Sequence, residues 1–160
     1  MNYDVVVIGA GFSGLYMLHK LREMGLSVVA LEAAEDIGGT WLFNRYPGAR
    51  CDIESIEYSY SFSDEIQQEW VWTETMPAQP EIEAYLHFVA DKLDLRRDIR
   101  LNTRVDAMTF SEDADAAAWT IDTDTGARFT ARFVVAASGI LSVPLEPDIP
   151  GVDDFEGAVL

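Results

Sequence analysis

The chain is poor in cysteine and has no long apolar run. Its 160 residues include one cysteine, Cys51, so no disulfide can form within the chain. This cysteine content is typical of a reducing compartment, and we expect a cytoplasmic location. No apolar run reaches the ~18 residues that a membrane span needs. Asp4 interrupts the first apolar run and no basic segment precedes it, so no signal peptide is predicted.

Positive charge is also scarce. Lysine and arginine together number 11, and only two of these are lysines, against 28 acidic residues and a net charge of −17. This balance argues against nucleic acid or an anionic membrane as a partner, and it is typical of a solvated acidic surface. The length predicts about one domain, and 49% hydrophobic residues are enough for a real core.

The strongest pattern lies at the N-terminus. Residues 5–8 are a continuous β-branched run, which predicts a central parallel strand buried on both faces. Gly9, Gly11 and Gly14 follow at once in the spacing Gly-x-Gly-x-x-Gly. Leucines at helical spacing come next, and Gly25 marks the end of that helix.

This strand, turn and helix suit a dinucleotide. Gly9 allows the turn, Gly11 lets the backbone approach a pyrophosphate, and Gly14 allows close packing of helix and strand. The N-terminus of the helix offers free N–H groups and a positive dipole to phosphates. A second apolar run, 27–31, ends in Glu32, whose carboxylate can accept the ribose hydroxyls. The alternative is a βαβ turn without a ligand.

The next segments contain candidates for site chemistry. Gly38 and Gly39 predict a second close approach of the backbone, or else an ordinary two-glycine loop. Residues 44–56 have no clean period and predict an irregular loop. Arg45, Arg50 and Asp52 in this loop are either site residues or exposed loop charges.

The remainder of the chain predicts mixed structure. The alternation of Tyr58, Tyr60 and Phe62 hints at an extended stretch, and Pro80 suits the first position of an amphipathic helix. We expect His19 and His87 to take no part in chemistry. The remaining expected elements are a strand at 99–105, an antiparallel meander at 108–110, 118–122 and 128–130 with a hairpin turn at 125–126, a parallel strand at 133–137, and a proline-punctuated connector from 142.

Four stretches carry a resemblance to a known family. Residues 9–14, 38–41, 44–55 and 137–139 resemble the N-terminal region of flavin-dependent Baeyer–Villiger monooxygenases. Residues 56–63 and 142–144 look most like the phenylacetone and steroid monooxygenase branch, and cyclohexanone monooxygenases belong to the same group. The resemblance covers essentially the whole chain. The string Arg-Tyr-Pro-Gly-Ala-Arg-Cys-Asp-Ile-Glu-Ser at 45–55 is far more specific than the glycine motif.

The resemblance implies an α/β, Rossmann-like fold for FAD or NAD(P), with a parallel sheet and a small antiparallel β-meander, incomplete at its C-terminus. It implies FAD as cofactor and, for the full-length parent, NADPH. It also implies a ketone substrate and O2, with an ester or lactone formed through a flavin C4a-peroxide. The expected domains are 1–141 for FAD binding and 142–160 as a connector towards an NADPH-binding domain that this chain lacks.

Site residues follow from the resemblance by position. Asp52 is expected to be catalytic, because the matching acid orients an active-site arginine. Cofactor contacts are expected from Gly9, Gly11, Phe12, Ser13, Gly14, Glu32, Gly39, Thr40, Trp41, Phe43, Arg50, Cys51, Asp52, Tyr58, Val105, Ser138 and Gly139. No metal site is expected. In the family aromatic residues commonly follow the matching tryptophan, whereas Leu42 follows Trp41 here.

Two rival interpretations remain open. One is another two-dinucleotide flavoprotein, such as an N- or S-oxygenating monooxygenase or a flavin reductase. The other is an inactive, truncated flavin-binding fragment. Phe155 and Gly157 match the opening of a family fingerprint whose later histidine is not in the chain, and Gly-x-Gly-x-x-Gly occurs once. We therefore expect 160 residues alone to be inactive.

Overall fold

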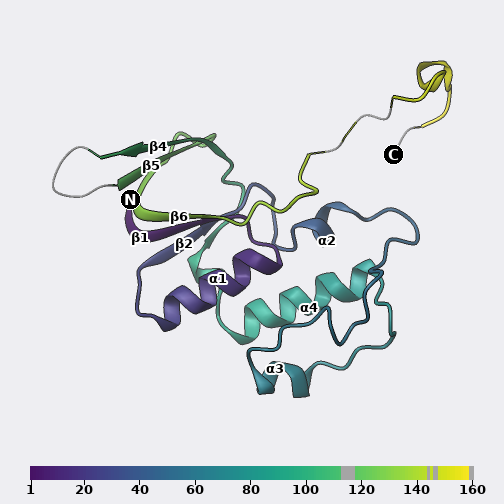
Figure 1. The fold of residues 1–160 in the computed structure, drawn as a ribbon, viewed down its shortest axis with the longest axis horizontal. Coiled ribbons are helices and arrows are strands. Elements are labelled where there is room, and N and C mark those ends of the chain that lie inside the picture. The colour runs from purple at the N-terminus through teal and green to yellow at the C-terminus, as the bar shows by residue number, and fades with distance from the viewer. Residues whose placement is uncertain (113–117, 144, 146–147, 159–160) are drawn as a thin grey trace.

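We analysed a computed structural model, which describes residues 1–112, 118–143, 145 and 148–158. The chain alternates strands and helices in its first half and is mainly strand in its second half (Figure 1). In order, the elements are β1 (Asn2–Ile8), α1 (Phe12–Glu23), β2 (Val28–Leu31), α2 (Thr40–Phe43), α3 (Asp64–Glu69), α4 (Gln79–Lys92), η1 (Arg96–Asp98), β3 (Ile99–Arg100), β4 (Val105–Ser111), β5 (Ala118–Thr123), β6 (Arg128–Ala136) and η2 (Val152–Asp154).

The strands form one six-stranded sheet in the order β3-β2-β1-β6-β5-β4. β1 pairs in parallel with β2 and with β6, and β2 pairs in parallel with β3. β4, β5 and the start of β6 are antiparallel. The predicted Rossmann-like sheet, with residues 5–8 in its middle beside residues 28–31, is confirmed.

β1 is buried because both its faces are covered. Val5 and Val7 pack with leucines of α1 on one face, and Val6 packs with Phe129 of the meander on the other. All three valines are at most 2% exposed. α1 ends just before Gly25, as predicted. Gly25 has φ 75°, and the N–H groups of Gly25 and Leu26 donate to carbonyls of the last turn of the helix.

Two strand predictions need correction. The expected strand 99–105 is two elements, because the chain turns between β3 and β4 through Asn102, at φ 49°. The separate strands expected at 128–130 and 133–137 are the single strand β6. Residues 128–131 of β6 pair with β5 and residues 130–136 pair with β1, so one strand joins the meander to the parallel sheet.

The segment between α2 and α4 is irregular except for α3, which the sequence analysis did not predict. Ser63 caps this short helix by accepting a hydrogen bond from the N–H of Ile66. The expected extended stretch at 58–62 forms no strand. Instead Tyr60 packs against Phe12 and against Tyr85 of α4, so local alternation gave way to packing on a helix. Trp70 and Trp72 also contact Tyr85 and pack in the same apolar cluster.

After β6 the chain leaves the sheet, and in Figure 1 its yellow C-terminal part lies away from the body. Of the predicted proline connector, Pro144 and Pro147 lie outside the described residues, as do the last two residues of the chain. Among the residues that the structure describes, no helix is both long and apolar enough to cross a membrane.

Candidate functional site

The glycine turn brings three backbone segments together. A Cβ built on Gly14 would lie 1.9 Å from the carbonyl oxygen of Gly9, so α1 meets the turn at a distance only glycine permits. A Cβ on Gly9 would lie 2.6 Å from the carbonyl oxygen of Ala137, just beyond β6. These contacts set the turn at the end of β1 against the start of α1, whose first N–H groups are free to bind an anion.

The second glycine pair lies against the first turn. A Cβ on Gly39 would approach the Cα of Gly11 to 3.1 Å, and one on Gly11 would lie 3.4 Å from the Cα of Gly39. The N–H of Gly38 donates to the carbonyl of Ala10 at 3.1 Å. The expected close approach at residues 38–39 is therefore one between two backbone turns, which leaves a rim made of peptide groups.

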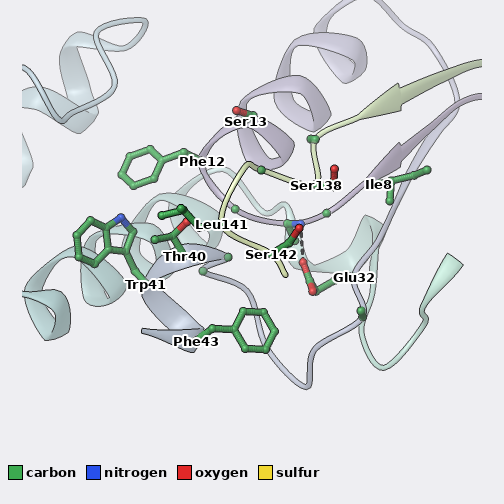
Figure 2. A pocket seen from close by; sticks show the side chains of 18 of the residues that line it. Ile8, Phe12, Ser13, Glu32, Thr40, Trp41, Phe43, Ser138, Leu141 and Ser142 are labelled. Atoms are coloured by element: carbon green, nitrogen blue, oxygen red, sulfur yellow. Dashed lines mark hydrogen bonds between the residues drawn. The ribbon is translucent and has the colours of Figure 1, made fainter. Parts of the chain in front are cut away.

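Glu32 is buried, at 6% exposed, at the end of β2. One carboxylate oxygen accepts the N–H of Ala10 at 2.7 Å, drawn as a dashed line in Figure 2, and the other accepts the N–H of Ala34 at 2.9 Å. Each carboxylate oxygen can accept more than one hydrogen bond, so both retain capacity for a hydroxyl group. Glu32 thus also ties the glycine turn to the loop after β2, a role that sequence reasoning missed.

A cavity of about 470 Å³ opens at this place. It lies at the carboxyl ends of β1, β2 and β6, where the chain crosses from one side of β1 to the other, which is the usual ligand site of an open α/β sheet. Figure 2 shows Phe12 and Trp41 on one side of it and Ile8 and Glu32 on the other. The volume is within the range of small-molecule and cofactor pockets.

Most residues expected to contact a cofactor line this cavity. They are Gly9, Gly11, Phe12, Ser13, Glu32, Gly39, Thr40, Trp41, Phe43, Tyr58, Val105, Ser138 and Gly139. Gly14 does not line it, because it is buried against Gly9. Arg50, Cys51 and Asp52 do not line it either.

The three residues outside the cavity follow α2 in the irregular loop. Arg50 pairs with Glu74 at 2.7 Å and donates to the carbonyl of Met76, also at 2.7 Å. Cys51 is buried, whereas Asp52 is exposed. Cys51 belongs to the buried apolar cluster against which Tyr58 packs, and Tyr58 lines the cavity, so this strip adjoins the cavity wall.

The aromatic side of the cavity is held by side chains. Trp41, 7% exposed, donates from its indole Nε1 to the hydroxyl oxygen of Tyr58 at 2.9 Å. The rings of Phe12 and Tyr58 meet edge to face with centroids 4.9 Å apart. Burial raises the pKa of Tyr58, and the hydrogen bond from Trp41 partly opposes that shift. Tyr58 therefore stays a neutral hydroxyl.

Sequence reasoning missed several lining residues. They are Ile8, Ala10, Leu31, Ala33, Thr103, Arg104, Ala137, Leu141, Ser142 and Val143, whereas Gly38, expected only as a close approach of the backbone, also lines the cavity. Ile8, Leu31 and Ala137 could have been found, because they lie at the carboxyl ends of predicted strands. Thr103 gave no signal, since it is placed by its backbone N–H, which donates to the carbonyl of Glu32 at 2.8 Å. No group of three or more metal-ligating side chains occurs among the described residues.

Comparison with known proteins agrees with this geometry. A family model described as an NAD(P)-binding Rossmann-like domain matches residues 7–68. The chain is 48% identical over 160 residues to phenazine N-monooxygenase PhzNO1 of Lysobacter antibioticus, an alignment that covers 99% of this chain and 29% of that protein. It is 46% identical over 157 residues to an acetone monooxygenase (methyl acetate-forming) of Gordonia sp. (strain TY-5), with 98% and 29% covered.

Solved structures give the same result. A structure described as oxidized steroid monooxygenase bound to NADP matches with TM-score 0.88 and 55% identity, over 96% of this chain and 29% of its own. An OTEMO complex with FAD and NADP matches with TM-score 0.87 and 42% identity, over 97% and 29%. The predicted similarity to Baeyer–Villiger and related flavin monooxygenases is confirmed. The chain spans 29% of the length of these relatives.

Proposed function

We propose that the chain is the FAD-binding part of a Baeyer–Villiger-type monooxygenase that uses NADPH and O2 to convert ketones to esters or lactones. The observation that carries the proposal is the cavity itself. It combines a glycine turn at a helix N-terminus, a buried acid and an aromatic wall at the carboxyl ends of three parallel strands. FAD needs the same three features, for its pyrophosphate, ribose and ring system.

The residues present fit that cofactor. Side chains at Gly11 and Gly39 would close the rim between the two turns, and their absence leaves peptide N–H groups for a pyrophosphate, next to Ser13. Glu32 would accept the adenosine ribose hydroxyls with the capacity that Ala10 and Ala34 leave, and the backbone of Val105 would meet adenine.

The aromatic wall suits the other half of the cofactor. Thr40, Trp41 and Tyr58 would lie along the flavin, with Phe43 and Ser138 at the rim of the cavity. When bound, FAD supplies the redox chemistry that activates O2. The wall's contribution is to orient the ring and to exclude water from it.

Asp52 is the proposed catalytic residue, acting beside the cavity rather than inside it. It is exposed and follows Cys51, which belongs to the cluster that Tyr58 packs against, and we propose that a group from another part of the complete protein meets it there. Because it is exposed, Asp52→Ala should slow ketone oxygenation far more than it lowers the melting temperature. A variant with full turnover and a lower melting temperature would make the role structural. Arg50 and Cys51 would border the nicotinamide pocket beside it.

The domain proposal follows from the same arrangement. Residues 1–141 would form the part that binds FAD, and 142–160 would connect it to an NADPH-binding domain in the complete protein.

The single cysteine favours a cytoplasmic location. In the proposed domain arrangement the second nucleotide site would lie outside residues 1–160, so these residues alone should form no ester from an aryl ketone with FAD and NADPH. Ester above a no-protein control would contradict this.

One observation favours a second candidate function, N-oxygenation. The phenazine N-monooxygenase is as similar to this chain as the acetone monooxygenase is, at 48% and 46% identity. The test is to give the complete protein a small aryl ketone and an aromatic N-heterocycle in parallel, with NADPH, and to identify the products. Ester supports the proposed function, and N-oxide without ester supports the second candidate.

A further inference from the structure

The aromatic wall of the cavity, formed by Phe12, Trp41 and Tyr58, depends on α2, a helix that is not stable on its own. Its four residues are too few for a stable isolated helix, and the carbonyl groups of so short a helix find few partners within it. The carbonyl of Thr40 accepts from the side-chain amide of Asn44 at 2.8 Å. The carbonyl of Trp41 needs a partner from elsewhere, and it belongs to a residue that lines the cavity.

Gln79, at the start of α4, provides that partner. It is 6% exposed, and its Nε2 donates to the carbonyl of Trp41 at 2.5 Å and to a carboxylate oxygen of Glu83 at 2.8 Å. Both partners are acceptors only, so the amide must present its NH2 group to them. A flipped amide would set an oxygen against two oxygens. Glu83 thereby fixes the orientation in which Gln79 holds Trp41.

Gln79 is the first member of a polar stripe along α4. Gln79, Glu83 and His87 are four residues apart, so they share one face of the helix. Glu83 also pairs with Arg45, and His87 contacts Arg96. We call Gln79, Glu83 and His87 the α4 ladder.

At the other end of the α4 ladder, His87 is linked through Arg96 to the segment that precedes Gly38 and Gly39. Arg96, which contacts His87, donates to Asp36 at 3.1 Å, and that carboxylate also accepts the N–H of Ile37 at 2.8 Å. The ladder is therefore linked to Asp36, before Gly38, by way of Arg96, and it contacts Trp41, after Gly39, directly through Gln79. It spans the part of the chain that forms one wall of the cavity.

We propose that Gln79 is a positioning residue for the flavin side of the site, acting through the backbone of Trp41. This inference rests on the proposed function, since it assigns the wall to flavin. Removing the amide of Gln79 leaves the buried carbonyl of Trp41 without its hydrogen-bond donor. α2 then shifts from the position in which it would contact the flavin ring.

The test variant is Gln79→Met, which keeps length and removes the donor. Two controls match it. Val89→Ala removes volume from the buried apolar face of the same helix, away from the cavity. Gln67→Met removes an exposed glutamine amide that also donates to backbone carbonyls, in α3. Val89→Ala controls for lost stability, and Gln67→Met controls for the chemical change.

Three measurements on the complete protein separate the roles: FAD affinity, the visible circular dichroism of the bound flavin, and amide hydrogen exchange without FAD. Gln79→Met should weaken FAD binding about tenfold, the order expected for an orphaned buried acceptor, and should change the flavin spectrum. Exchange should accelerate at residues 41–44, whose N–H groups bond to carbonyls of residues 38–40. Neither control should produce these three changes.

The outcomes divide cleanly. If wild-type protein binds FAD and Gln79→Met has wild-type affinity, spectrum and exchange, this inference is wrong and the proposed function stands. If Val89→Ala reproduces all three changes at equal loss of stability, Gln79 is merely structural and the inference is also wrong. If the wild type binds no FAD, the proposed function fails and takes this inference with it, whatever the exchange data show.

Discussion

One end of the cavity is built from backbone and the other from side chains. At the glycine turn, peptide groups of Gly9, Gly14 and Ala137 are packed so closely that no Cβ fits between them. At the aromatic wall, Trp41 is held by hydrogen bonds to the Tyr58 hydroxyl and the Gln79 amide. A backbone contact tolerates no added atom, whereas a side-chain contact can be weakened in steps. The two ends should therefore respond differently to substitution.

The largest effect is expected at Gly14. Gly14→Ala puts a methyl group 1.9 Å from the carbonyl oxygen of Gly9, so helix and turn must separate. We expect a loss of about 3 kcal/mol or more in the free energy of unfolding, the upper part of the range for overpacking, together with loss of FAD binding. Chemical denaturation of the complete protein measures it.

Gly25→Ala is the matched control, because it meets no atom within 4 Å but has φ 75°. It should cost roughly 1–2 kcal/mol from backbone conformation alone. Equal losses at Gly14 and Gly25 would show that the close approach at the turn carries no special cost.

Glu32→Gln comes next and probes the backbone end through a side chain. The carboxylate accepts one N–H on each oxygen, and an amide replaces one of these acceptors with a donor. We expect about 1–3 kcal/mol less stability without any ligand, and weaker FAD binding in addition. Glu35→Gln, in the exposed loop nearby, should change neither. Unchanged stability with weaker FAD binding would limit Glu32 to the ribose.

At the side-chain end, Tyr58→Phe should act more mildly. It removes the acceptor of the Trp41 indole N–H and leaves the ring contacts in place. We expect a loss of about 1 kcal/mol in stability and a shift in the absorption spectrum of bound FAD. Tyr46→Phe, at an exposed tyrosine outside the cavity, is the control. Loss of all FAD binding in Tyr58→Phe would mean that this end is as intolerant as the glycine turn.

These differences explain what could be predicted from the sequence. Hydrophobic periodicity and glycine spacing depend directly on backbone geometry, so they predicted β1, α1, β2 and the meander. The wall was placed only by resemblance, because a contact such as Gln79 to Trp41 joins residues 38 positions apart and leaves no local pattern. α3 was missed for a related reason: Ser63 caps it, but only Ile66 of its six residues is buried.

The smallest effect concerns pH and lies in α1, where the ring of His19 stacks on Phe62. Burial lowers the pKa of His19 below its usual value of 6.5, against the opposing charge of Glu23. The folded state therefore prefers the neutral ring. This contribution to stability is complete above pH 6.5 and is lost as pH falls through the lowered pKa. Replacing His19 with Asn should flatten this part of the stability profile, and an unchanged slope between pH 7 and 5 would assign it to other groups.

Comparing FAD with FMN in a fluorescence titration of the complete protein is the sharpest test of the proposed FAD site. FMN lacks the adenosine half, so in the proposed binding mode it would contact the aromatic wall but not Glu32 or the backbone of Val105. FAD should bind at least 100-fold more tightly than FMN, a difference of about 2.7 kcal/mol, and Glu32→Gln should reduce this preference. Equal affinity for the two flavins, or binding of neither, would contradict it.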